Sequence, residues 1–225
     1  EIDLLYSDLI ISERFILIPP KKMWFYICDY IIILLSLKIL HYSFVFLHNT
    51  IFFDFGRYFM EKNQYEIYHE NKKHTPNDFP YNTYLCSIPL DFKSVNLHWH
   101  NEVELIVIKK GQGLVNVNLV TYTVNAGDVV FVFPGQLHSI SQKDYSIMEY
   151  ENILFKSSLL KSSGYDLCND KFIQPLLSGN LNIYPVINSN FDFHDSLYSL
   201  INEIDKLCDK RPYAYQLAVK SYLFQ

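Results

Sequence analysis

Three histidines and one glutamate are spaced so that their side chains could converge on one bound group. His98 and His100 flank Trp99, and Glu104 follows four residues after the second histidine. Alternate side chains of a strand point to one face, so the two imidazoles and the carboxylate share a face that excludes Trp99. A third imidazole, His138, ends the stretch GDVVFVFPGQLH.

Three kinds of chemistry fit this group of side chains. Imidazole nitrogens and a carboxylate oxygen are ligands for divalent transition metals, and positions left open would accept a substrate. The same side chains can exchange hydrogen bonds with a small organic ligand in a pocket. The histidines can also be structural. The spacing alone leaves these three interpretations open and marks His98, His100, Glu104 and His138 as the candidate site.

The candidate site lies within a series of short β-forming runs. The runs cover residues 84–88, 103–110, 114–119, 122–124, 129–133 and 146–155. Turns are expected between them at Gly111–Gly113, Asn125–Asp128 and Pro134–Gly135. Short strands at this spacing, with no helices between them, predict an antiparallel sandwich or barrel.

The hydrophobic periodicity changes near the end of the chain. Apolar residues recur at three- and four-residue steps from Phe193 to Leu207, which predicts an amphipathic helix. Asn190 or Asp192 is expected to cap its start, and Pro212 is expected to end it and open a second, mostly apolar helix. The apolar stripe of the first helix fits a dimer contact and a cover for the barrel equally well.

Charge and cysteine content restrict the classes of function. The chain has 225 residues and a formal net charge of -5, so it lacks the basic character of a self-sufficient nucleic-acid-binding protein. Its four cysteines are far apart and form no zinc-binding pattern, which indicates free thiols in a reducing compartment, the cytoplasm. The sequence has no glycine-rich phosphate loop, Ser-His-Asp order or paired-carboxylate signature.

Residues 1–59 differ in composition from the rest of the chain. They contain no alanine or glutamine, one glycine and 33 Ile, Leu, Phe or Tyr residues, which is unusual for a folded domain. The stretch 30–48 has about the length of a membrane span, but Lys38 and His41 near its centre make insertion marginal. We expect a misread untranslated leader with a true start at Met60; a membrane-associated segment and a pair of core helices are the alternatives.

The spacing of the candidate site resembles two signatures of the cupin superfamily. The first is matched by His98, His100, Glu104 and Gly111, and the second by Gly127, Gly135 and His138. Phe92, Phe133 and Gln142 stand where those signatures usually have glycine, proline and asparagine. The resemblance implies a mainly β fold, a cupin-type (jelly-roll) antiparallel barrel followed by two C-terminal helices, and it permits a bound metal at the four side chains.

Residues 80–225 as a whole resemble the sensing half of an AraC-type transcriptional regulator. The similar stretches are LHWHNEVELIVIKKGQG, VNAGDVVFVFPGQLHSI, SLLKSSGYDLCNDKFIQPLL and DKLCDKRPYAYQLAVKSYLFQ. The resemblance implies a bacterial sensing domain rather than an enzyme, which binds a small effector such as a sugar and forms a homodimer through its helices. DNA would be bound only by a helix-turn-helix domain that this sequence lacks, so the chain is expected to be a fragment cut at both ends.

The predicted order of segments follows from these observations. It is a doubtful leader over 1–59, an N-terminal arm over 60–83, a cupin-like barrel over 84–160, a connecting segment over 161–189 and a helical dimerisation segment over 190–225. His98, His100, Glu104 and His138 are the predicted ligand-binding residues. No cofactor is expected, although the same four side chains could hold a divalent transition metal.

The sequence also leaves two alternative functions open and predicts the positions of several individual residues. The main alternative is a small metal-dependent cupin enzyme, a dioxygenase or isomerase, whose metal activates oxygen or polarises a carbonyl. A membrane protein is the weaker alternative. Trp99 is expected to pack outside the barrel or at a subunit contact, Lys109 and Lys110 to be solvated turn residues, and His194 to be a surface residue.

Overall fold

Eight β-strands form the central part of the computed structural model, which describes residues 62–225 except 163, 180 and 182. The strands are β1 (Tyr81–Ile88), β2 (Ser94–His98), β3 (Glu102–Val117), β4 (Val120–Asn125), β5 (Val129–Val132), β6 (His138–Gln142), β7 (Met148–Lys156) and β8 (Val186–Ile187). The predictions for residues 1–59, including the stretch 30–48, lie outside the described residues. Among the described residues, no helix is both long and apolar enough to cross a bilayer.

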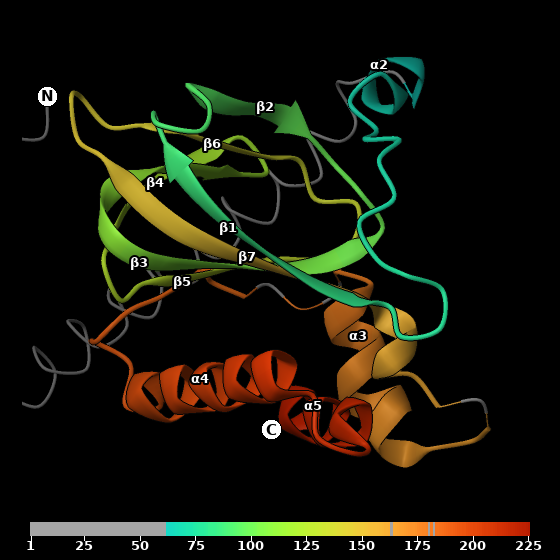
Figure 1. The fold of residues 1–225 in the computed structure, drawn as a ribbon. Helices are drawn as coiled ribbons and strands as arrows, with labels where there is room; N and C mark the ends of the chain where they lie inside the picture. Colours follow the sequence, from blue (N-terminus) through green and yellow to red (C-terminus); the bar gives the residue numbers. More distant parts are fainter. Residues whose placement is uncertain (1–61, 163, 180, 182) are drawn as a thin grey trace, which may run out of the picture. The chain divides into compact units, whose positions relative to one another are not determined.

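The strands form two antiparallel sheets that share one long strand (Figure 1). One sheet has the order β1-β7-β3-β5-β8, while β4 and β6 pair with the second half of β3, and β2 pairs with β6. Aliphatic side chains such as Ile106, Val115 and Ile140 fill the space between the sheets and are almost fully buried. The predicted mainly β, antiparallel barrel is therefore confirmed.

One predicted turn is instead the interior of a strand. β3 runs without a break through Gly111 and Gly113, and the chain reverses only at Asn118 and Leu119. Gly111 has a φ of +75°, and the pairing with β7 shifts register just before it, so the strand bends there from one sheet into the other. The glycines permit the close crossing of β7, because a Cβ at Gly111 would collide with the carbonyl oxygen of Ile147.

The other two predicted turns are present. Asn125–Asp128 reverses the chain between β4 and β5, with the Asp128 amide donating to the Asn125 carbonyl at 2.9 Å. Pro134–Gly135 lies in the connection between β5 and β6. The short strands β2, β6 and β8 were missing from the predicted runs, because each has few consecutive β-forming residues and is fixed by its pairing partners.

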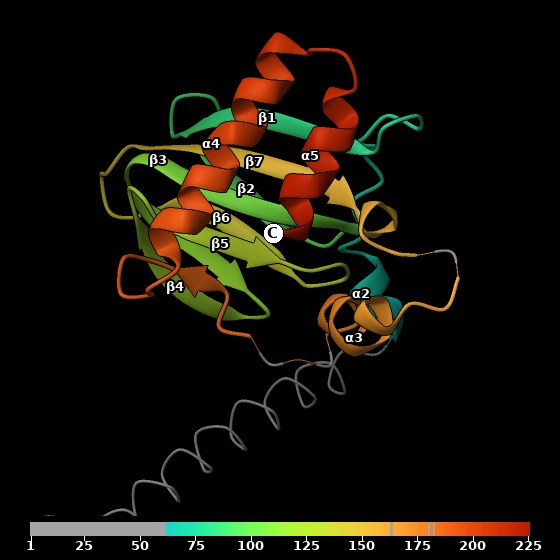
Figure 2. The same ribbon diagram turned by 90° about the horizontal axis from the view of Figure 1, so that it is seen from below.

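Helices cover the outer face of the sheet that contains β1, β7, β3 and β5 (Figure 2). They are α4 (His194–Lys210) and α5 (Tyr215–Phe224), preceded by a π-helical turn (Asn169–Ile173) and α3 (Gln174–Leu177), while η1 (Ser157–Leu159) follows β7. Ile201 and Ile204 of α4 and Val219 of α5 are buried in one core cluster with side chains of this sheet, such as Val107. The apolar stripe of α4 therefore covers the barrel.

The ends of these helices differ from the predictions. α4 begins after Phe193, which provides no side-chain cap, so the predicted capping by Asn190 or Asp192 is wrong. The second helix begins at Tyr215, three residues after Pro212. Hydrophobic packing on the sheet selects the helical segment here, and a cap contributes only about 1 kcal/mol.

Candidate functional site

Three strands and one connection bring the four predicted residues together at one end of the barrel. His98 ends β2 and is paired directly with His138, the first residue of β6. Glu104 lies near the start of β3, and His100 lies between β2 and β3, where its carbonyl accepts a hydrogen bond from the Gly135 amide at 2.9 Å. The convergence predicted from the spacing is present.

The Glu104 carboxylate is the centre of this histidine cluster, which we define as His98, His100, Glu104 and His138. Its Oε2 atom lies 2.9 Å from His138 Nε2 and 3.0 Å from His100 Nε2. The side chains of Glu104 and His100 are 3% exposed and that of His138 is 1% exposed, so these groups are removed from water. One nitrogen of each of the three imidazoles lies within 4.8 Å of the others.

Backbone contacts fix the tautomers of two of the imidazoles. His98 Nδ1 lies 2.8 Å from the Asn96 carbonyl oxygen, and His138 Nδ1 lies 2.9 Å from that of Gln136. A carbonyl only accepts hydrogen bonds, so both Nδ1 atoms donate. In the neutral form of each ring, Nε2 therefore carries no hydrogen and has a free lone pair. Histidines that bind metals are usually held in this way, with one nitrogen donating and the other on the metal.

Two imidazole nitrogens of the cluster are buried without a hydrogen bond. They are His100 Nδ1 and His138 Nε2, the latter close to the Glu104 carboxylate but not aligned with it. Buried polar atoms in proteins are nearly always paired, so unpaired ones call for a partner such as a ligand, water or ion. This donor set, with three imidazoles and a carboxylate, fits a divalent transition metal.

Burial and mutual contact set the charges in the cluster. Burial alone would raise the pKa of Glu104, but the contacts with His100 and His138 outweigh it and hold the pKa far below its usual range. Burial likewise opposes the charged form of His138, yet the Glu104 carboxylate raises the pKa of this imidazole. Burial and the nearby His138 lower the pKa of His98, which keeps its Nε2 lone pair available.

The segment before β1 adds two residues that were not predicted for the site. Glu70 Oε2 lies 2.7 Å from His74 Nε2 and 3.5 Å from His98 Nε2. The His74 ring centre lies 5.5 Å from that of His100, and the residue is 9% exposed. The only local signal for them is the dense run of histidine and glutamate at 69–74, about 25 residues before His98.

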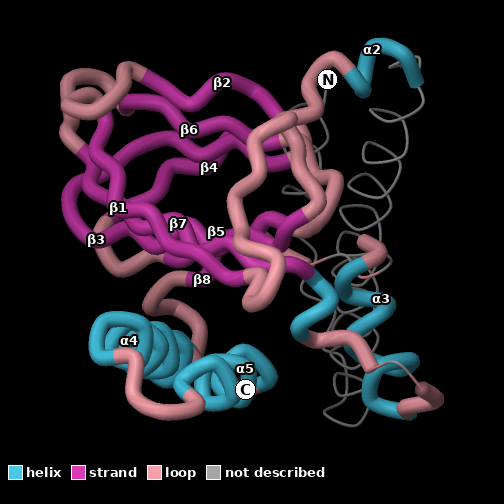
Figure 3. Tube along the Cα trace, turned by 45° about the vertical axis from the view of Figure 1, so that its right-hand side comes forward, coloured by secondary structure: helices cyan, strands magenta, loops and turns pink. Residues whose placement is uncertain are grey.

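Trp99 attaches this arm to the barrel. Figure 1 and Figure 3 show the segment before β1 running beside the strands. The Trp99 ring stacks on Tyr65 with centroids 4.9 Å apart, and its indole Nε1 donates to the Tyr65 carbonyl at 2.9 Å. Backbone hydrogen bonds of 2.9 Å join the Trp99 amide to the Tyr68 carbonyl and the Glu70 amide to the Trp99 carbonyl. Trp99 thus packs on the arm, which includes α2 (Lys62–Glu66), and its ring centroid also lies 4.2 Å from that of His69, as expected for a side chain outside the barrel.

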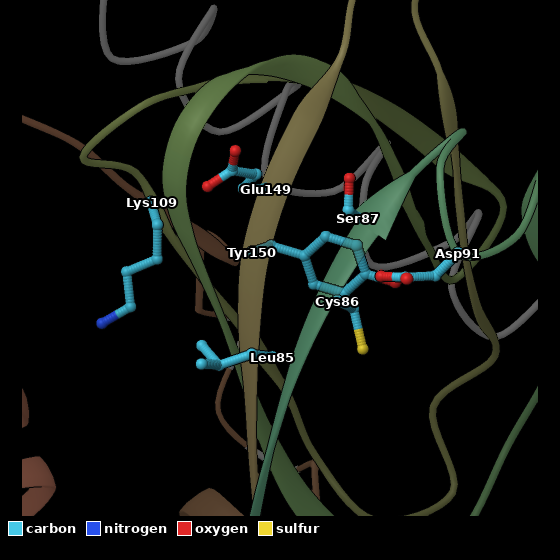
Figure 4. A pocket seen from close by; sticks show the side chains of 7 residues that line it. All are labelled: Leu85, Cys86, Ser87, Asp91, Lys109, Glu149 and Tyr150. Carbon is cyan, nitrogen blue, oxygen red and sulfur yellow. The ribbon is translucent and has the colours of Figure 1, made fainter.

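A separate pocket of about 210 Å³ lies along β1 and β7 (Figure 4). It is lined by Leu85, Cys86, Ser87, Asp91, Lys109, Glu149 and Tyr150. None of the four residues of the histidine cluster lines it. Its thiol is a poor nucleophile, because burial raises the pKa of Cys86. We therefore place the candidate site at the histidine cluster rather than at this pocket.

Two surface predictions are wrong. Lys109 is half-buried and joins the barrel to α4, with its Nζ 2.7 Å from Glu151 Oε2 and 3.4 Å from Asp205 Oδ2. His194 has a side chain only 13% exposed, and its Nε2 donates to the Gly127 carbonyl at 2.9 Å. Lys110 is 73% exposed, as expected for a solvated residue. The sequence predicted the helix but could not show that it packs over Lys109.

Known proteins resemble parts of this chain. Residues 91–179 match the family model of the AraC-like ligand binding domain. The uncharacterized HTH-type transcriptional regulator YdeC of Bacillus subtilis is 22% identical over 155 residues, which cover 68% of this chain and 52% of that protein. The chain thus spans about half the length of this curated relative.

Three solved structures that resemble this chain each match less than half of it. A predicted oxalate decarboxylase of Thermotoga maritima is 33% identical, with a TM-score of 0.27 over 28% of this chain and 56% of that chain. A cupin 2 conserved barrel domain protein of Salinispora arenicola is 19% identical, with a TM-score of 0.31 over 35% and 66%. A cupin protein of Bacteroides fragilis is 19% identical, with a TM-score of 0.32 over 39% and 74%.

The family match and the strand order agree with each other. The matched segment contains β2 to β7, and with them all four residues of the histidine cluster. The expected cupin-type barrel is the observed arrangement of two antiparallel sheets that share β3. The match to the AraC-like ligand binding domain thus covers both the strands that carry the candidate site and its four side chains.

Proposed function

We propose that the described part of the chain senses a small-molecule effector for a DNA-binding transcriptional regulator, and that the effector binds at the histidine cluster. The observation that carries this proposal is the buried group of imidazoles around Glu104, at one end of a barrel otherwise filled with aliphatic side chains. Burying ionisable groups is costly, and clusters of them with shifted pKa values mark functional sites more often than structural ones.

The cluster supplies both kinds of hydrogen-bonding group that a polar effector needs. Glu104 accepts hydrogen bonds, and the imidazoles donate or accept according to their protonation. A sugar, whose hydroxyl groups do both, matches this chemistry. In the arm, Glu70 and His74 lie against the cluster, so an effector that fits only one arm position would change the population of that position.

We further propose that His98, His100, Glu104 and His138 hold a divalent transition-metal ion. The fixed tautomers of His98 and His138 and the unpaired ring nitrogens support this assignment. A bound ion would act as a Lewis acid toward a polar group of the effector. The chain's own residues would orient that ion, with the carbonyls of Asn96 and Gln136 holding two of the rings.

The remaining partners belong to the same proposal. Leu217 and Phe224 of α5 are 71% and 52% exposed, which supports a homodimer contact within 190–225. Cys86, Cys168 and Cys208 are free thiols, which supports a location in the cytoplasm. DNA would be bound by a helix-turn-helix domain elsewhere in the regulator, in keeping with the regulator that the chain resembles.

Enzymatic activity is the second candidate function, because the same donor set could serve a metal-dependent dioxygenase or isomerase. The metal-compatible tautomers of His98 and His138 are the observation in its favour. The two functions differ in the fate of the small molecule: a sensor releases it unchanged, whereas an enzyme converts it. The family match over 91–179 supports the sensing role.

Ligand-dependent thermal unfolding tests the proposed function. The full chain, wild type and His98→Asn, is heated with a panel of monosaccharides and small carboxylates, each with and without Zn²⁺, and His194→Gln serves as the control. We expect at least one compound to raise the Tm of the wild type and the control by several degrees, but not that of His98→Asn. NMR of the recovered compound then distinguishes the functions, since conversion in the presence of metal would favour the enzyme.

A further inference from the structure

The arm brings a second carboxylate to the histidine cluster. Glu70 Oε2 lies 3.5 Å from His98 Nε2. Glu70 precedes β1 in the sequence, whereas the histidine cluster comes from β2, β3, β6 and the connection between β2 and β3. The Glu70 side chain is 29% exposed and that of His98 is 18% exposed, so this contact lies at the solvent end of the cluster. The two groups are 28 residues apart in the sequence and meet where Trp99 packs on the arm.

We propose that Glu70 is a further ligand of the divalent metal ion in the histidine cluster, so that metal binding fastens the arm to the barrel. This inference rests on the proposed metal site. Bonds of about 2.0 to 2.2 Å place two neighbouring ligand atoms of one ion roughly 3 to 3.5 Å apart. The separations from Glu70 to His98, from Glu104 to His100 and from Glu104 to His138 are 3.5, 3.0 and 2.9 Å.

His74 is a positioning residue for this carboxylate. Its Nε2 lies 2.7 Å from Glu70 Oε2, and His74 follows Glu70 by four residues in the same arm. Asn82 Nδ2 and the Tyr84 hydroxyl donate to the His74 carbonyl at 2.9 and 3.4 Å, so β1 fixes the backbone that carries His74. Partners that orient a metal-ligating carboxylate in this way usually strengthen metal binding by about 10- to 100-fold.

An ordinary salt bridge between Glu70 and His74 would explain only part of the geometry. It accounts for the 2.7 Å contact, but a carboxylate paired with His74 alone has no need to approach His98. The Tyr65 hydroxyl also donates to the Gly135 carbonyl, so both ends of the arm segment are attached while Glu70 lies between them. This arrangement presents Glu70 to the cluster.

Cleavage by trypsin within the arm can show whether the arm is docked on the barrel. Lys72 and Lys73 are exposed and lie between Glu70 and His74, so trypsin can cut there when the arm leaves the barrel. An ion that binds more tightly when Glu70 is in place stabilises the docked state by the difference in binding energy, which reduces the population open to cleavage. Lys161, exposed and far from the arm in sequence, provides an internal reference site.

The test uses the full metal-free chain with and without Zn²⁺, in the wild type, Glu70→Gln and the control Glu66→Gln. Glu66 is an exposed carboxylate in the same arm, so its substitution makes the same change of charge. We measure Zn²⁺ affinity by calorimetry and cleavage at Lys72 and Lys73, relative to Lys161, by mass spectrometry. We expect Zn²⁺ to slow arm cleavage at least 10-fold in the wild type and in Glu66→Gln. We expect Glu70→Gln to bind Zn²⁺ about 10-fold more weakly and to lose the protection, and Glu70→Asp to be intermediate.

The outcomes separate this inference from the proposal on which it rests. Equal Zn²⁺ affinity and equal protection in Glu70→Gln and the wild type would overturn the role of Glu70 while leaving a metal in the histidine cluster. No Zn²⁺ binding by the wild type, or binding that His98→Asn leaves intact, would overturn both. Circular dichroism of Glu70→Gln checks that the barrel is folded before either result is interpreted.

Discussion

The imidazole rings of His98 and His138 lie 4.1 Å apart on paired strands, and each donates its Nδ1 hydrogen to the backbone carbonyl two residues before it. The two strands thus repeat the same local contact on both sides of the cluster. The His138 Nε2 atom lies 2.9 Å from the Glu104 carboxylate, and the His98 Nε2 atom lies 3.5 Å from that of Glu70. This relationship is the strongest structural argument for a ligand at this place.

Loss of the Glu104 charge should destabilise the fold. In the metal-free protein, Glu104→Gln removes the buried carboxylate that the His100 and His138 imidazoles contact, and removing one partner of a buried pair usually costs about 3 to 5 kcal/mol. The free energy of unfolding in urea measures this cost. Glu149→Gln is the matched control, because Glu149 pairs with Lys110 at the surface and the change should cost below about 1 kcal/mol. Similar losses in both variants would contradict the charge assignment.

Lys109 and Lys110 are neighbours with very different expected contributions to stability. Lys109→Met leaves Glu151, which is 5% exposed, and Asp205 without their cation at the contact between β3, β7 and α4. We expect a loss of about 3 kcal/mol, seen in denaturant unfolding. Lys110→Met removes a pair in solvent and should change the free energy by less than about 1 kcal/mol. A harmless Lys109→Met would show that this ionic contact is not formed.

Alanine substitutions at two glycines with positive φ distinguish the cost of backbone strain from the cost of a steric collision. Gly111→Ala would collide with the Ile147 carbonyl oxygen at the crossing of β3 and β7, in addition to the strain of its φ of +75°. Gly127→Ala has a φ of +94° with nothing within 4 Å of the new methyl group. We expect losses of about 3 to 5 kcal/mol and about 1 to 2 kcal/mol, respectively. Thermal unfolding that ranks them in the opposite order would refute the crossing at Gly111.

His194 should make part of the stability depend on pH. Its hydrogen bond to the Gly127 carbonyl, followed by the nearby Asp195, raises the pKa of this imidazole in the folded state. The resulting stability is complete below the unfolded pKa of about 6.5 and is lost as the pH rises through the higher folded pKa. Relative to the wild type, His194→Gln should therefore lose more Tm at pH 5.5 than at pH 8.5, by roughly 2 to 4 °C. A pH-independent difference would contradict the charged contact.

The sequence predicted those features that depend on short-range patterns. Alternation in the strand and the H-x-H, glutamate spacing located His98, His100 and Glu104, because neighbouring residues of a strand keep their relative directions. The arm residues Glu70 and His74 were missed, since their approach depends on the Trp99 contact between distant segments. Gly111–Gly113 was misinterpreted as a turn, because a glycine at a bulge and a glycine in a turn give the same local signal.

A calorimetric titration of the metal-free full chain with Zn²⁺ measures whether the histidine cluster holds a metal ion. If it does, the wild type binds one ion per chain, and His138→Asn, which removes the most buried ring, binds it at least about 100-fold more weakly. His194→Gln should bind like the wild type. No binding by the wild type, or equal binding by His138→Asn, would contradict the proposed metal site in the histidine cluster.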